Sequence, residues 1–226
     1  VNVICYLQFL GYERDIYAFG SSTDSDETTT SITPASWAFF TWSIMNVLML
    51  GGITYQFLPE GKCIIIDTIS WRFPLAAVQN TVLVNLLISH HCIMAFILAL
   101  FILYYSIPCM SNRVQETDLV ESASQKLFRQ FFIHIPLSLY KGSITTLLVL
   151  TLFDAFSRKA EILAEIITFA GLLVLASASI VYSREGDLPS SITISWFLFA
   201  LFGSQKTTAL IQWTAHVLGI ISILFI

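Results

Sequence analysis

The side chains that could do chemistry in this chain are few, and they stand singly inside long apolar runs. Trp37 and Trp42 stand five residues apart where the first long run begins, and Asn46 follows Trp42 by four residues. This spacing places Trp42 and Asn46 on one face of a helix. Aromatic rings beside one oriented polar group are typical of a pocket for an apolar ligand, and Asn85 in the next run could add a second such group. The alternative is that these amides hydrogen-bond across helices.

A second set of polar side chains lies in the later apolar segment 131–153. His134 and Lys141 are seven residues apart, on one helix face, and Tyr140 is next to Lys141. Ionisable groups at membrane depth are costly unless they face protein, water or ligand, so these residues are candidates for a cavity wall. Lys141 is expected either to pair with a carboxylate or a ligand, or to reach an interface through its long side chain. Pro136 and Gly142 in the same segment predict a kinked helix that a neighbouring helix approaches closely.

Motifs for catalysis and metal binding are missing from the sequence. There is no GxSxG elbow, no HExxH helix and no Gly-rich phosphate loop. The four cysteines are scattered without CxxC spacing and read as small packing residues. We therefore expect no catalytic residue and no metal, and we expect that the protein is not an enzyme. The net charge of -4, with no basic stripe, also argues against a nucleic-acid partner.

The composition is that of an integral membrane protein. Hydrophobic residues make up 56% of the 226 residues and charged residues only 12%, and the mean hydropathy is +0.76. Residues 73–112 contain no Asp, Glu, Lys or Arg, whereas one helical span needs only about twenty residues. We therefore expect more than one span within this window alone, and membrane lipids as partners.

The hydropathy pattern predicts an all-α, polytopic transmembrane helix bundle of about six to seven spans. We expect a single membrane domain over 1–226, in which 1–10 is the end of a longer helix, 11–33 is an acidic Ser/Thr-rich loop and 34–226 is the bundle. The connection after the second segment is expected at Ser89-His90-His91, and the last two segments are expected to form a hairpin. The seven apolar segments are 37–58, 74–89, 92–109, 131–153, 162–182, 189–204 and 207–226.

Three motifs resemble those of the tryptophan-rich relatives of the TspO/MBR family, the group that includes the translocator protein. Residues 32–42 read ITPASWAFFTW, similar to the ITPAGWAFxxW signature. Residues 136–145 read PLSLYKGSIT and resemble PFSLYxGWIT, and residues 187–196 read DLPSSITISW, similar to DxxYAxxIAW. The chain departs from these patterns in having Ser36 for Gly, Asn46 for Tyr and Ser143 for Trp, and in lacking a Trp shortly after Asn85.

The resemblance implies a TspO/MBR-like core with a pocket between helices for a tetrapyrrole, a sterol or another lipid. The sequence itself assigns no cofactor. The resemblance leaves open a mitochondrial or other organelle membrane as the location, and a homo-oligomer or a larger complex as the assembly. The alternative function is that of an accessory subunit of a larger membrane complex, in which the tryptophans are packing elements and anchors. The residues expected to line the pocket are Trp37, Trp42, Asn46, Asn85, His134, Tyr140, Lys141 and Trp196.

Overall fold

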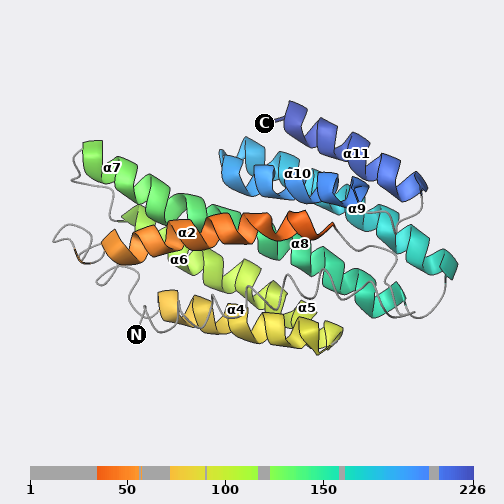
Figure 1. Cartoon of the computed structure of the whole chain (residues 1–226), viewed down its shortest axis with the longest axis horizontal. Helices are drawn as coiled ribbons and strands as arrows, with labels where there is room; N and C mark the ends of the chain where they lie inside the picture. The colour runs from red at the N-terminus through yellow and green to blue at the C-terminus, as the bar shows by residue number, and fades with distance from the viewer. Residues whose placement is uncertain are drawn as a thin grey trace.

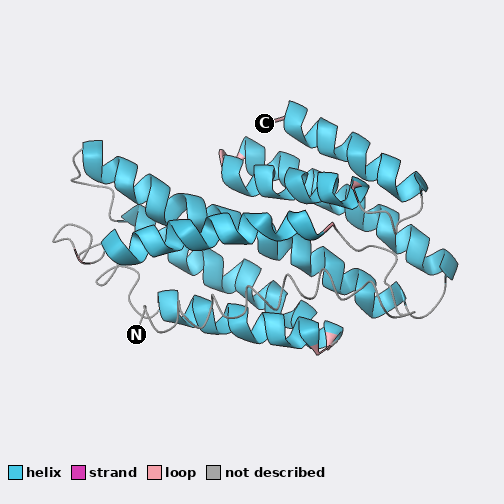
Figure 2. Ribbon diagram, in the orientation of Figure 1, coloured by secondary structure: helices cyan, strands magenta, loops and turns pink. Residues whose placement is uncertain are grey.

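A computed structural model shows that the chain folds as a bundle of helices (Figure 1). The structure describes residues 35–55, 57, 72–89, 91–116, 123–157, 161–203 and 209–226. All regular elements in these ranges are helices (Figure 2), as the hydropathy pattern predicts. The apolar segment expected at 1–10 and the acidic loop expected at 11–33 lie outside the described residues.

The first half of the bundle contains three of the predicted segments. A short 3-10 turn, η1, leads directly into α2, and the π-helical turn η3 joins α5 to α6 without a break. The chain reverses between α4 and α5 at Ser89 and His91, where the polar turn was predicted. The bounds are η1 Ser36–Phe39, α2 Phe40–Tyr55, α4 Arg72–Ile88, α5 Cys92–Phe101, η3 Ile102–Ser106 and α6 Ile107–Glu116.

The second half contains the other four predicted segments. A continuous rod is made of α7, a second π-helical turn η4, and α8. Two antiparallel helices, α10 and α11, follow α9 and pack on each other, as expected for a hairpin. The bounds are α7 Ala123–Arg129, η4 Gln130–His134, α8 Ile135–Ser157, α9 Glu161–Arg184, α10 Leu188–Phe202 and α11 Ala209–Leu224.

The helix α8 lies at the centre of the bundle. It packs against α2, α5, α9 and α10, with the α4–α5 hairpin on one side and α9, α10 and α11 on the other (Figure 1). Cys92–Ser111, Lys126–Phe153 and Ile166–Arg184 are long and apolar enough to cross a bilayer, and three shorter apolar helices accompany them. Many large apolar side chains on these helices remain exposed, which in water would be unfavourable but suits contact with lipid. The protein is an integral membrane protein.

The π-helical turn η4 ends two residues before Pro136, where the sequence predicts a kink. Proline has no N–H to bond the carbonyl of Phe132, four residues before it, and its ring crowds that oxygen. Locally wider turns relieve such a conflict. A Cβ atom on Gly52 of α2 would lie 3.0 Å from this carbonyl oxygen, so α2 approaches η4 closely where it has no side chain.

Serine hydroxyls join α9 to α10. The Oγ atom of Ser179 lies 2.8 Å from Oγ of Ser191 and 3.3 Å from Oγ of Ser195, and it donates to the Ser191 carbonyl at 3.2 Å. All three residues are fully or almost fully buried. Without a hydrophobic effect between helices in lipid, small residues that allow close approach and polar contacts of this kind contribute to helix association. This contact fixes α10, which carries the third motif, against the bundle.

Candidate functional site

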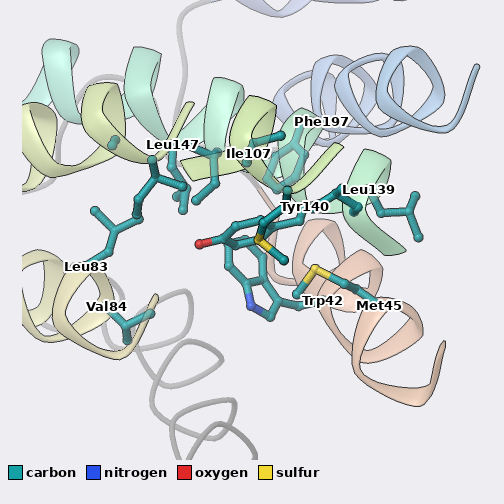
Figure 3. Close-up of a cluster of buried hydrophobic side chains, with 14 of the residues drawn as sticks. Trp42, Met45, Leu83, Val84, Ile107, Leu139, Tyr140, Leu147 and Phe197 are labelled. Atoms are coloured by element: carbon teal, nitrogen blue, oxygen red, sulfur yellow. The ribbon is translucent and has the colours of Figure 1, made fainter. Parts of the chain in front are cut away.

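Trp42 of α2 and Tyr140 of α8 lie together in the main hydrophobic core. Their exposed fractions are 1% and 3%. In Figure 3 the Trp42 and Tyr140 rings overlap, and the Tyr140 hydroxyl points away from Leu139, toward the side of Leu83 and Val84 on α4. The first two motifs therefore contribute side chains to the same buried core.

Trp42 and Tyr140 each bring a hydrogen-bonding group into this core that the described part of the protein does not satisfy. The indole Nε1 of Trp42 and the hydroxyl of Tyr140 are both buried without a hydrogen-bond partner there. Such a group costs about 1–3 kcal/mol relative to one that is hydrogen-bonded. Asn46, one turn beyond Trp42 on α2, is 1% exposed and brings a third polar side chain into the interior. The arrangement can offer directed hydrogen bonds within apolar walls.

Trp37 and Trp196 form a separate aromatic pair that joins the first and third motifs. Their ring centroids are 4.9 Å apart with an interplanar angle of 84°, the edge-to-face geometry that aromatic rings favour. The backbone N–H of Ala35 donates to the carbonyl of Ala200 at 3.1 Å, which ties the start of α2 to the end of α10. Both rings are about two-fifths exposed, with fractions of 41% and 39%, so this pair reaches the bundle surface.

Lys141 is part of an ion pair that joins the second and third motifs. Its Nζ atom lies 3.1 Å from Oδ2 of Asp187 and 3.6 Å from Oε2 of Glu185, and 3.9 Å from the centroid of the Tyr182 ring. Asp187 caps α10, because its Oδ1 atom accepts from the backbone N–H of Ser190 at 3.4 Å. The ammonium therefore has protein partners, and it links α8 to the turn between α9 and α10.

The last two predicted site residues lie elsewhere. Asn85 is exposed on α4, and its Nδ2 atom donates to the carbonyl of Thr81 on the same helix at 3.4 Å. His134 is half-buried at the end of η4. The structure thus brings Trp42 and Tyr140 together with Asn46 nearby, and it distributes the remaining predicted residues over the Trp37–Trp196 pair, the Lys141 ion pair and these two positions.

A family model described as TSPO-like protein matches residues 10–226, which is nearly the whole chain. The chain belongs to the TSPO-like family. This membership confirms the relation to TspO/MBR proteins that the three motifs indicate. No curated protein and no solved structure gave a match to the chain.

The sequence of this TSPO-like protein contains a helix-start signal that places one Lys141 partner, Asp187, at the beginning of α10. The spacing of residues within one helix could not reveal it. Asp187 immediately precedes Leu188 and Pro189, and an acidic residue before a Pro in the first turn is typical of a helix N-terminus. That signal places a carboxylate at the end of α10 but not beside Lys141. Within the described ranges, His, Cys, Asp and Glu side chains form no group of three or more that could hold a metal ion.

Proposed function

We propose that this TSPO-like protein binds a flat or amphipathic apolar molecule, a tetrapyrrole or a sterol, between α2 and α8. The observation that carries the proposal is the pair of buried, unsatisfied groups on Trp42 and Tyr140. Both can donate a hydrogen bond, so they suit a ligand with an acceptor, such as a tetrapyrrole carboxylate or a sterol hydroxyl. The function is then one of binding, in transport or in sensing, rather than of catalysis.

The side chains around Trp42 and Tyr140 are suited to a ligand whose main part is apolar. Trp42 and Tyr140 are packed among Met45, Leu83 and Phe197, all of them buried (Figure 3). A methionine side chain has several rotatable bonds and adapts to different neighbours, so Met45 can move aside for a guest more readily than a branched residue. The nearby ammonium of Lys141 is already held by Asp187 and Glu185, so the ligand's polar group is met by the indole and the phenol.

The test is an equilibrium titration of the purified full-length chain, in detergent or nanodiscs, with protoporphyrin IX and separately with a sterol. Trp42→Phe and Tyr140→Phe each remove a polar group and keep a large aromatic ring. We expect each to weaken binding by roughly five- to tenfold, the loss of about one hydrogen bond. Trp213→Phe is the matched control, because that ring is 62% exposed on α11.

Binding should be followed by the absorbance or fluorescence of the ligand, since the substitutions change the tryptophan signal itself. If neither ligand binds saturably, or if the Trp42 and Tyr140 variants bind as tightly as the Trp213 control, the proposed site is wrong.

A further inference from the structure

The helix α4 carries two buried carboxamides that the proposed ligand contacts do not use. Asn80 and Gln79 are only 2% and 8% exposed. Within the described ranges, neither the Oδ1 atom of Asn80 nor the Oε1 atom of Gln79 accepts a hydrogen bond. Buried polar groups are nearly always hydrogen-bonded, so two adjacent exceptions on one helix indicate a place where a donor is needed.

Asn80 lies on the face of α4 that turns toward Trp42 and Tyr140. Leu83 and Val84 of this face belong to the same buried core as the two aromatic residues. With about 3.6 residues per turn, Asn80 lies between Leu83 and Val84 around the helix axis, one turn before them. The Tyr140 hydroxyl points toward this side of the core (Figure 3). Asn80 and Tyr140 are therefore polar groups on opposite walls of one apolar interior.

The two walls offer complementary hydrogen-bonding groups. The indole N–H of Trp42 and the hydroxyl of Tyr140, on α2 and α8, can each donate and have no acceptor among the described residues. The carboxamide oxygen of Asn80, on α4, can only accept. A ligand that satisfies both walls must therefore present an acceptor and a donor close together.

A hydroxyl is the simplest single group that meets both requirements. Its oxygen accepts from the Tyr140 hydroxyl, and its own hydrogen is donated to the Asn80 oxygen. A carboxylate or a ketone can accept from Tyr140 but has no hydrogen for Asn80. An ammonium can donate to Asn80 but cannot accept from the indole of Trp42. Both of these classes leave one buried group unsatisfied, which weakens binding.

We infer that Asn80 determines which polar group the ligand presents to this site, and that this group is a hydroxyl on an otherwise apolar molecule. The inference rests on the proposed site between α2 and α8, to which it adds α4 as a third wall. It narrows the ligand to an apolar alcohol, of which a sterol is one example. Gln79, at the edge of the same face, offers a second acceptor beside Asn80.

The test compares cholestanol with cholestanone, which differ only in having a hydroxyl or a ketone at one carbon atom. Each competes with tritiated cholesterol for the purified full-length chain in sterol-free nanodiscs. We expect the wild type to bind cholestanol about tenfold more tightly, because the ketone leaves the Asn80 oxygen without a donor. In Asn80→Leu, which keeps a side chain of similar size, the two sterols should bind equally. Tyr140→Phe should weaken both, since its hydroxyl can donate to either oxygen.

Asn85→Leu is the matched control, with the same substitution on the same helix. Asn85 is exposed, and its Nδ2 atom donates to the carbonyl of Thr81 within α4. This variant should keep the tenfold preference for cholestanol.

Three outcomes overturn the inference. Equal binding of the two sterols by the wild type would show that the site needs no donor. An unchanged preference in Asn80→Leu would show that Asn80 does not accept from the ligand, as expected if a buried water satisfies it. Saturable binding of protoporphyrin IX without binding of either sterol would reject the hydroxyl and leave the proposed site between α2 and α8 in place.

Discussion

The ammonium of Lys141 lies 3.1 Å from the carboxylate of Asp187, 46 residues away along the chain. This contact joins the second turn of the central helix α8 to the residue that caps α10. Ser190 strengthens it, since its Oγ atom lies 2.8 Å from Oδ2 of Asp187 and 2.7 Å from the carbonyl of Ser138 on α8. The ion pair therefore fixes the position of α10 along α8.

Removal of the Asp187 carboxylate should destabilise the bundle. Asp187→Ala takes away both the partner of Lys141 and the cap of α10, and we expect a loss of about 1–3 kcal/mol in the free energy of unfolding. Thermal and denaturant unfolding in detergent would measure it. Glu185→Gln is the control, because Glu185 is more exposed and 3.6 Å from the ammonium, so its loss should be below about 1 kcal/mol. Equal effects of the two variants would contradict a specific role for Asp187.

Tyr140→Phe should stabilise the ligand-free protein. The Tyr140 hydroxyl is buried without a partner within the described structure, so its removal relieves a cost of about 1–3 kcal/mol. Tyr182→Phe is the matched control, since that hydroxyl lies 3.2 Å from Oγ1 of Thr145 and its removal should cost about 1 kcal/mol. Unfolding of both variants in the absence of ligand checks the opposite signs. A loss of stability in Tyr140→Phe would show that its hydroxyl is satisfied.

Gly142→Ala should separate α8 from α10. A Cβ atom there would lie 2.7 Å from the carbonyl oxygen of Ser190 and 2.9 Å from Cβ of Thr193, both on α10 and neither able to swing away. Overpacking of this kind costs typically about 1–3 kcal/mol. In Gly219→Ala the new atom would meet only the Phe199 ring, at 3.3 Å, so this control should lose less. The melting temperatures of the two variants in one detergent measure the difference. Equal melting temperatures would contradict the prediction.

The elements of this fold were predictable because helices that cross lipid must be long and apolar. Each of the seven predicted apolar segments contains a helix, and the turn at Ser89 and His91 lies where a polar break interrupts the longest uncharged window. The close approach at Gly142 was also visible, since a residue without a side chain leaves room for a neighbouring helix.

The grouping of the polar residues was not predictable in the same way. The helices α2 and α8 are apolar on nearly all sides, so their sequences contain little signal for which face turns inward. Spacing correctly placed Trp42 and Asn46 on one face, and both are buried, but the same argument could not show that Asn85 faces outward.

The sequence by itself determined the class of protein, the order of its described apolar helices and its family, because these follow from hydropathy and from local motifs. Only the tertiary structure decided that Trp42 and Tyr140 share one buried core, that Trp37 contacts Trp196 and that Lys141 pairs with Asp187. The physical reason is that each of these contacts joins two helices. Their rotation and register are set by packing at residues such as Gly52 and Gly142, rather than by any periodicity within one helix.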